Sequence, residues 1–380
     1  MDFTFTEEQL AAVEAAKAVF SGVAPDAVPS PALTAGAVAE DFDRPLWARL
    51  AASDLLSLVL DAEHGGAGLD PIALCLVLRE SARVLARLPL LETSAVALTV
   101  QRYGQAELRR ELLPAVGRGE LALTVAANGR TGHDGAELAV TAGRDGDHWV
   151  FDGAQTGVPW APTCDRIAVP AHTADGHTVL ALVPRAERGV TLAEQISTSG
   201  ERFAELRLEA VRVDAGAVIT ADGAWEWLRD LLATGTCALA LGLGEAVLAL
   251  TGHYTGKREQ FGHPVATFQA VAVQAADRYI DLRAMEATLW QAAWRISTGA
   301  DSALPVAGDV AVAKIWASEG VRRVVQTAQH LHGGFGADTD YALHRYHAWA
   351  KQLELSLGSA AAHEEALGEL LASHPLGQPA

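Results

Sequence analysis

The sequence is poor in cysteine and in aromatic residues, and both shortages narrow the kinds of protein it can encode. Its 380 residues include only three cysteines, Cys75, Cys164 and Cys237, which are widely spaced and form no CxxC pair. This spacing argues against a disulfide framework or a cysteine zinc site and predicts free thiols in a reducing compartment. Aromatic residues make up 6% of the chain, whereas half of it is hydrophobic and alanine is abundant. Such a composition is typical of helices that pack closely through small side chains.

Positive charge and long apolar runs are scarce as well. Lys and Arg total 29 against 47 Asp and Glu, which gives a formal net charge of -18. Such a surface repels nucleic acids and anionic membranes, so we expect neither as a partner. The most apolar run, residues 231–254, contains Glu245 and scattered Gly and Thr, which favours a buried helix over a membrane span. The first twenty residues are acidic and do not resemble a signal peptide, so we expect a cytoplasmic protein.

The hydrophobic period changes twice along the chain and divides it into three blocks. The first reads as helices and opens with Thr6 before Glu-Glu-Gln, a capping pattern. The second contains short β-rich segments between turn residues, which predict antiparallel strands of a small barrel or sandwich. In the third block the helical period returns and predicts a bundle of four long helices. These helices are expected at residues 224–257, 264–298, 302–331 and 340–372. We therefore predict an α+β, mainly α protein with a helical domain (1–117), a β-domain (118–220) and a four-helix domain (221–380).

Two stretches of the last block have residues suited to a phosphate-bearing ligand. Lys257 and Arg258 follow a predicted helix, where cations are favoured by the helix dipole, but the planar fork of Arg258 also suits a pyrophosphate. Gly333 and Gly334, in the stretch HGGFG, either stop a helix or let backbone amides approach phosphates. His332, His344 and His347 lie in this region without convincing ligand spacing, so we predict no metal site.

Taken together, the motif order resembles the acyl-CoA dehydrogenase family. The resemblance rests on REQFG, then QHLHGGFG, then DYALHRY, and it extends over almost the whole chain through FTEEQ and EHGGAGLD. It implies an N-terminal helical domain, a middle β-domain and a C-terminal four-helix domain, in agreement with the three blocks. It also implies FAD-dependent α,β-dehydrogenation of an acyl-CoA or another acyl thioester, with electrons passed to an electron-transfer flavoprotein.

The resemblance further implies that FAD lies between the β-domain and the C-terminal helices, and that a second subunit completes its site. Three residues of REQFG match positions that contact the FAD of a neighbouring subunit, and the glycine pair matches glycines beside its phosphates. His330 stands where the family commonly has glutamine, and a neutral imidazole still offers one donor. Thr124 is retained from a segment that lines the flavin. The expected cofactor-binding residues are Arg258, Gln260, Phe261, His330, Gly333, Gly334 and Thr124.

The chain departs from the family pattern at the catalytic base. The family removes the α-proton with a glutamate at one of two places, and these correspond here to Leu357 and Leu232. Leucine cannot accept a proton. The nearest acids are Asp230 and Glu354. A shift of two residues along a helix, as from Leu232 to Asp230, turns the side chain to a different face. Both are weak candidates for the base, and the simpler interpretation is that they are solvated charges on helices.

These departures resemble the base-less subunit of actinobacterial heterotetrameric acyl-CoA dehydrogenases. The first hypothesis is therefore a subunit that works with a base-bearing paralogue in an α2β2 tetramer. The second is a self-sufficient homotetramer or homodimer with an unusual base, and the missing acid counts against it. The third is a catalytically silent structural or acyl-thioester-binding homologue, against which the retained Arg258, Gln260 and glycine pair count.

Overall fold

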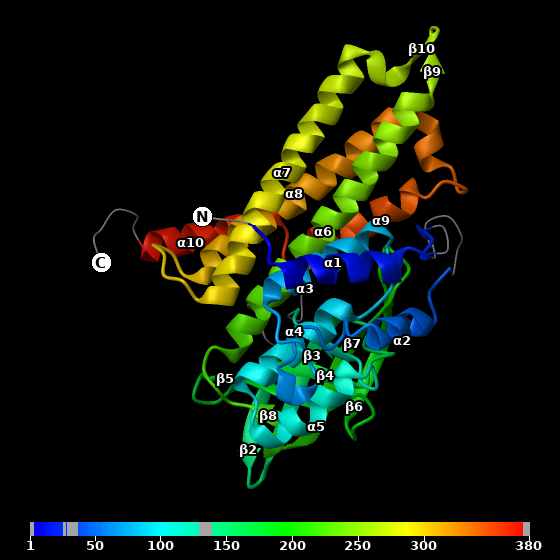
Figure 1. Ribbon diagram of the computed structural model, residues 1–380. Helices are drawn as coiled ribbons and strands as arrows, with labels where there is room; N and C mark the ends of the chain where they lie inside the picture. The colour runs from blue at the N-terminus through cyan, green and yellow to red at the C-terminus, as the bar shows by residue number, and fades with distance from the viewer. Residues whose placement is uncertain (1–3, 26–27, 29–36, 129–138, 375–380) are drawn as a thin grey trace.

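A computed structural model of the chain describes residues 4–25, 28, 37–128 and 139–374. Helices come first, strands follow, and long helices end the chain, as the periodicity predicted (Figure 1). The strands of the middle block gather at one end of the molecule, and the longest helices run from there to the opposite end (Figure 1). This arrangement confirms the predicted mainly α fold with a β-domain in the middle.

In the described residues of the N-terminal part, five helices and a short 3-10 turn, η2, precede the strands. The capping pattern at Thr6 is confirmed, because its Oγ1 accepts from the Gln9 N–H (3.2 Å) and its own N–H donates to Gln9 Oε1 (3.0 Å). Asp43 and Asp70 cap the second and third helices through their side chains. The elements are α1 (Glu7–Phe20), α2 (Arg44–Ala52), η2 (Ala62–His64), α3 (Pro71–Arg83), α4 (Leu90–Tyr103) and α5 (Ala106–Gly117).

The strands form one eight-stranded sheet with a hydrophobic core of its own. Its order is β6-β7-β3-β2-β4-β5-β8, with β1 also paired to β4. The expectation of purely antiparallel strands is wrong, since β4 runs parallel to both β1 and β2. Alternation of apolar residues tells which face of a strand is buried but not which way its neighbour runs. The strands are β1 (Leu123–Val125), β2 (Val140–Asp145), β3 (His148–Pro159), β4 (Arg166–Thr173), β5 (Thr178–Pro184), β6 (Val190–Ile196), β7 (Arg202–Asp214) and, after η3 (Ala215–Ala217), β8 (Val218–Ile219).

The C-terminal part differs from the prediction in two places. The second helix begins at Gln269, because the residues from Pro264 onward first form a hairpin strand and a 3-10 turn. The predicted fourth helix is two helices, separated by a break in which Leu357 (φ 59°) and Gly358 (φ 98°) have left-handed backbone. The elements are α6 (Ala224–Lys257), β9 (Glu259–Gln260), β10 (His263–Pro264), η4 (Val265–Thr267), α7 (Gln269–Thr298), α8 (Val306–His332), η5 (Gly333–Ala337), α9 (Leu343–Leu355) and α10 (Ala360–Ser373).

Helix α6 is the axis of the molecule, since it contacts α3 and α4 of the N-terminal part and α7, α8 and α9 of the C-terminal part. Among the described residues it is the one helix long and apolar enough to cross a membrane, but 78% of its most apolar window is buried inside the protein. Glycines allow this close packing. A Cβ added at Gly242 would lie 2.0 Å from the carbonyl oxygen of Arg79 in α3, far inside van der Waals contact. All three cysteines are free and buried, as predicted.

Two glycines of α6 give a matched test of this packing. Gly242→Ala should lower the free energy of unfolding by about 1–3 kcal/mol, because the new methyl group meets the α3 backbone. Gly252→Ala should raise it by up to about 1 kcal/mol, because a Cβ there meets nothing within 4 Å and alanine favours the helix. Urea unfolding of both variants measures the difference. If both variants changed the free energy of unfolding in the same direction, close packing at Gly242 would be contradicted.

Candidate functional site

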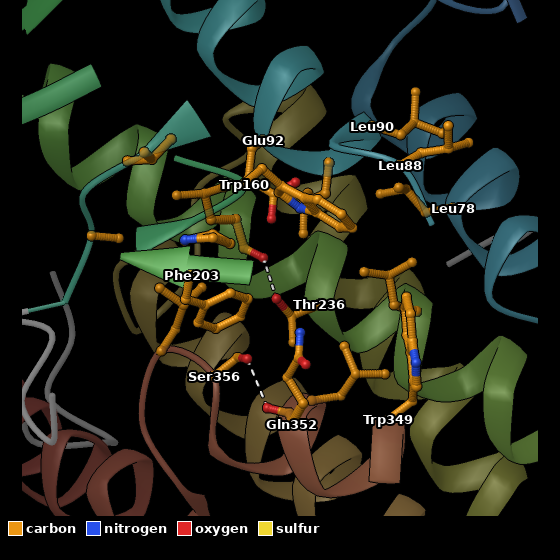
Figure 2. Close-up of a pocket in the computed structure, with 18 of the residues that line it drawn as sticks. Leu78, Leu88, Leu90, Glu92, Trp160, Phe203, Thr236, Trp349, Gln352 and Ser356 are labelled. Carbon is orange, nitrogen blue, oxygen red and sulfur yellow. Dashed lines mark hydrogen bonds between the residues drawn. The ribbon is translucent and has the colours of Figure 1, made fainter. Parts of the chain in front are cut away.

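A cavity of about 110 Å³ lies where the N-terminal helices, the sheet and the C-terminal helices meet. We call it the interdomain cavity (Figure 2). Its walls come from α3, α4, the ends of β1, β3 and β7, helix α6 and the end of α9. Half of the lining residues are leucine or aromatic. The lining residues are Leu78, Ser81, Ala86, Leu88, Leu90, Leu91, Glu92, Val125, Ala127, Asn128, Gly157, Pro159, Trp160, Phe203, Leu232, Thr236, Leu239, Trp349, Gln352, Leu353, Ser356 and Leu357.

The end of β3 brings Trp160 into this cavity. Pro159 ends the strand, and Trp160 follows with left-handed backbone (φ 57°). Its carbonyl accepts from the backbone N–H groups of Thr163 and Cys164, each at 2.9 Å, which closes a tight turn. The indole ring therefore leaves the sheet and lies against the cavity (Figure 2).

Both leucines at the expected base positions line the interdomain cavity. Leu232 comes from α6, and Leu357 comes from the break between α9 and α10. Asp230 and Glu354 are not among the described residues that line it. Burial raises the pKa of Asp230 to about 6, whereas the Glu354 carboxylate pairs with Lys351 at 2.6 Å. Neither acid therefore faces the space that the two leucines enclose.

A buried lysine holds the break that carries Leu357. Lys314 of α8 is fully buried, and its Nζ donates to the carbonyl oxygens of Gly358 (3.0 Å) and Glu354 (3.2 Å) and to Ser318 Oγ (2.7 Å). Burial lowers the pKa of Lys314 to about 8. The carbonyls at a helix C-terminus have no partner within their own helix, so the ammonium group satisfies the end of α9. The same contacts fix the backbone on both sides of Leu357.

The structure also shows a carboxyl group that sequence reasoning missed. Glu92, in the first turn of α4, lines the cavity. Burial raises its pKa to about 7, and hydrogen bonds from its own backbone N–H and from the Trp160 side chain oppose that rise. Glu92 is the single ionisable side chain among the described lining residues. Its signal in the sequence is weak, because an acid in the first turn of a helix is ordinary.

Six of the seven expected cofactor residues lie together at the other end of the molecule. Arg258 follows α6, and Gln260 and Phe261 form the tip of the β9–β10 hairpin, where Phe261 is 91% exposed. This hairpin lies at the end of the helices opposite the sheet (Figure 1). Tyr254 of α6 stacks on His332 and Phe335 at centroid distances of 4.3 and 5.4 Å. That stacking joins the end of α6 to η5. We call this set the bundle-end cluster: Arg258, Gln260, Phe261, His330, Gly333 and Gly334.

The bundle-end cluster has the chemistry needed for a diphosphate. Gly333 has φ 60° and ψ −140°, a backbone conformation essentially restricted to glycine. A Cβ at Gly333 or at Gly334 would meet nothing within 4 Å, so both backbones face open space. Arg258 and His330 are exposed nearby and can donate to phosphate oxygens. These residues fit the diphosphate part of FAD.

Thr124 lies apart from this cluster. It is fully buried in β1, and its hydroxyl donates to the carbonyl oxygen of Pro159. Its neighbours Val125, Ala127 and Asn128 line the cavity instead. Within the described part of the chain, no group of three or more His, Cys, Asp and Glu side chains is arranged to hold a metal ion.

Comparisons with known proteins cover both helical parts of the chain. Residues 6–120 match the profile of the acyl-CoA dehydrogenase N-terminal domain, and residues 225–371 match that of the C-terminal domain. The chain is 35% identical over 339 residues to the acyl-CoA dehydrogenase FadE27 of Mycobacterium tuberculosis, which covers 88% of this chain and 90% of that protein.

Two solved structures are similar over nearly the whole chain. One is a variant of the Tcur3481-Tcur3483 steroid ACAD, with a TM-score of 0.88 and 37% identity over 97% of this chain and 98% of that one. The other is the ChsE4-ChsE5 complex from Mycobacterium tuberculosis, with a TM-score of 0.89 and 33% identity over the full length of both chains.

The raised pKa of Glu92 predicts a pH-dependent gain of stability in Glu92→Gln. The folded-state value of about 7 lies above the usual 4.5, so the contribution of Glu92 is present below pH 4.5 and is lost as the pH rises through 7. The free energy of unfolding of the variant, relative to that of the wild type, should therefore rise by up to about 3 kcal/mol between pH 5 and pH 8. Denaturant unfolding at both pH values measures this gain. Glu107→Gln, at an exposed position on α5, should show no such pH dependence, and an equal gain in both variants would contradict the burial of Glu92.

Replacing the buried lysine should loosen the α9–α10 break. Lys314→Met leaves the carbonyl of Gly358 without this donor and the carbonyl of Glu354 with the Ser318 hydroxyl alone, so we expect a loss of about 2–4 kcal/mol in the free energy of unfolding. Lys351→Met removes only a partly exposed ion pair to the same Glu354 and should cost less than about 1 kcal/mol. Denaturant unfolding compares them, and equal losses would argue against a structural role for Lys314.

Proposed function

Because the chain belongs to the acyl-CoA dehydrogenase family, we propose that it is a subunit of a heteromeric dehydrogenase whose catalytic base comes from a paralogous partner. Family members use FAD to oxidise the CH–CH bond of an acyl-CoA. The observation that carries the proposal is the pair of leucines, Leu232 and Leu357, in the wall of the interdomain cavity. Proton abstraction from Cα requires a basic group within reach, and neither side chain can serve.

The bundle-end cluster is the contribution of this chain to cofactor binding. Bound FAD would supply a hydride acceptor for the β-hydrogen of the substrate. The guanidinium group of Arg258 would donate to its diphosphate, and the open backbone at Gly333 and Gly334 would let phosphate oxygens approach. Since the cluster lies at the far end of the helices from the interdomain cavity, its exposure supports binding to the FAD of a neighbouring subunit (Figure 1).

The size of the cavity supports placing the acyl group in the partner. Pockets for drug-sized ligands are roughly 300–1,000 Å³, and the interdomain cavity has only about 110 Å³. One similar structure is a steroid ACAD and another is a complex of two differently named chains. We propose a bulky acyl thioester as the substrate, an α2β2 tetramer as the assembly, and an electron-transfer flavoprotein as the electron acceptor.

One observation favours a second candidate function, a self-sufficient homo-oligomer. Such an enzyme needs a carboxylate in the cavity, and Glu92 lines it with a pKa of about 7, near the value that suits a general base. Glu92 is therefore a better candidate for an unusual base than Asp230 or Glu354, which do not line the cavity.

Purification of the chain alone and after co-expression with a base-bearing paralogue distinguishes the heteromeric subunit from the self-sufficient homo-oligomer. We expect FAD and acyl-CoA oxidation in the mixed tetramer, and neither in the chain alone, by native mass spectrometry, flavin absorbance and a dye-reduction assay. Within the mixed tetramer, Arg258→Ala should weaken FAD binding about tenfold, because it removes a charge-assisted hydrogen bond. Lys257→Ala, at the neighbouring exposed cation, is the matched control and should bind FAD nearly as the wild type does.

A flavin-loaded, active homo-oligomer would overturn the base-less assignment. In that case Glu92→Gln should abolish its turnover without releasing flavin, whereas Asp230→Asn and Glu354→Gln should leave turnover intact. Unchanged flavin binding in the Arg258→Ala tetramer would remove Arg258 from the cofactor site.

A further inference from the structure

The glycine segment of the bundle-end cluster is joined at its two ends by a side-chain hydrogen bond. His332 ends α8 directly before Gly333, and Tyr341 lies just before α9. The Tyr341 hydroxyl and His332 Nε2 are 3.0 Å apart. The backbone carbonyl of Tyr341 accepts from His344 Nδ1 at 2.8 Å, which ties this end of the segment to α9. The contact closes residues 332–341 into a loop that contains both open glycines.

The donor and the acceptor of this bond can be assigned from the other side of the imidazole ring. His332 Nδ1 lies 2.8 Å from the carbonyl oxygen of Ala328, and a carbonyl only accepts, so Nδ1 carries a hydrogen. His332 is 3% exposed, and burial lowers its pKa, so the ring is neutral at neutral pH. Nε2 of this neutral ring has a free lone pair, and the Tyr341 hydroxyl donates to it.

Ring packing surrounds the pair without fixing it as sharply as the hydrogen bond does. Tyr254 stacks on the imidazole at a centroid distance of 4.3 Å, and Phe335 packs on Tyr341 at 4.6 Å. Packed rings tolerate a range of offsets, whereas a hydrogen bond requires a distance and an angle. The Tyr254 hydroxyl lies 3.4 Å from the His332 carbonyl oxygen, beyond the usual range of about 2.5–3.0 Å for such a bond.

The pair can influence a phosphate only through the backbone beside it. His332 is buried, and both of its ring nitrogens already have partners. Gly333, the next residue, has a backbone conformation essentially restricted to glycine. Glycine has many other conformations available in a loop whose ends are free. If only part of the molecules held the competent loop conformation, the apparent affinity for a ligand would fall by that fraction.

We propose that the hydrogen bond between Tyr341 and His332 positions the glycine segment for the diphosphate of FAD. The inference rests on the proposed function, because it takes FAD as the ligand of the bundle-end cluster. The two residues are positioning residues that hold the loop in one arrangement before the cofactor arrives. Loss of their bond should therefore slow association and leave dissociation unchanged, since fewer molecules are competent at any moment. Loss of a direct contact, as in Arg258→Ala, should mainly speed dissociation.

The test removes one hydroxyl at a time from the same group of rings. Tyr341→Phe keeps the ring but removes the donor to His332 Nε2, and Tyr254→Phe removes the hydroxyl that makes only the 3.4 Å contact. FAD binding to the deflavinated mixed tetramer is followed by stopped-flow flavin fluorescence. Association should be about three- to tenfold slower in Tyr341→Phe, the range for one neutral hydrogen bond, and should change less than about twofold in Tyr254→Phe.

A double variant identifies His332 as the partner of Tyr341. In His332→Phe the ring keeps its stacking on Tyr254 but has no nitrogen, so adding Tyr341→Phe should slow association no further. Thermal unfolding of each variant verifies that the compared proteins are folded.

Amide hydrogen exchange of the chain alone reports the same contact without flavin. The N–H groups of Gly333, Asp338 and Tyr341 donate to backbone carbonyls. Their exchange should be about three- to tenfold faster in Tyr341→Phe and close to the wild-type rate in Tyr254→Phe.

The proposal would be overturned by faster dissociation with unchanged association in Tyr341→Phe, by equal effects of the two tyrosine variants, or by additive effects in the double variant. Unchanged amide exchange in Tyr341→Phe would overturn it as well. If Arg258→Ala weakens FAD binding while Tyr341→Phe behaves as the wild type, this inference fails and the proposed function stands. If Arg258→Ala leaves FAD binding unchanged, the cofactor assignment of the bundle-end cluster fails, and this inference fails with it.

Discussion

The rest of the structure depends on the contact between α6 and the backbone of α3. Gly242 lets the two helices approach so closely that no side chain fits between them. One turn of helix away, Glu245 accepts from Arg79 Nε at 2.8 Å and from Arg83 at 2.9 Å, with only 11% of its side chain exposed. A paired, mostly buried carboxylate of this kind fixes register, because any slip would leave its charge unpaired. The N-terminal helices are thereby held against the C-terminal bundle, and the interdomain cavity forms where that junction meets the sheet.

The far wall of the cavity depends on a second buried charge. Lys314 binds the last carbonyls of α9 and the carbonyl of Gly358, so the chain stops being helical at a fixed point. Leu357 then adopts left-handed backbone and lies in the cavity wall. A leucine in that conformation is strained, and it persists because the surrounding contacts determine it. The position that the family resemblance assigns to an acid is thus fixed by the fold, and a leucine occupies it.

How much of this structure the sequence predicted depends on how far apart in the chain the interacting residues lie. Helical periodicity located α6 to the residue, because its apolar pattern is local. Motif comparison located Leu232 and Leu357, and both line one cavity. The α9–α10 break was missed, since the lysine that holds it lies more than thirty residues earlier in the chain. Glu92 was missed for the same reason. Its side-chain hydrogen bond comes from Trp160, a residue of another domain that reaches it through a left-handed turn after β3.

The two functional regions lie far apart along one helix. Leu232 and Arg258 are separated along α6 and its cap by twenty-six residues, which at about 1.5 Å per residue is about 40 Å. The cavity end has apolar walls and a single carboxyl group, whereas the hairpin end has exposed cations, open glycines and a phenylalanine that is 91% exposed. The ring at the hairpin tip keeps nearly all of its apolar surface in water. The two ends therefore differ in chemistry, and the proposed contact of the hairpin end with the FAD of a neighbouring subunit would account for both its charge and its exposed ring.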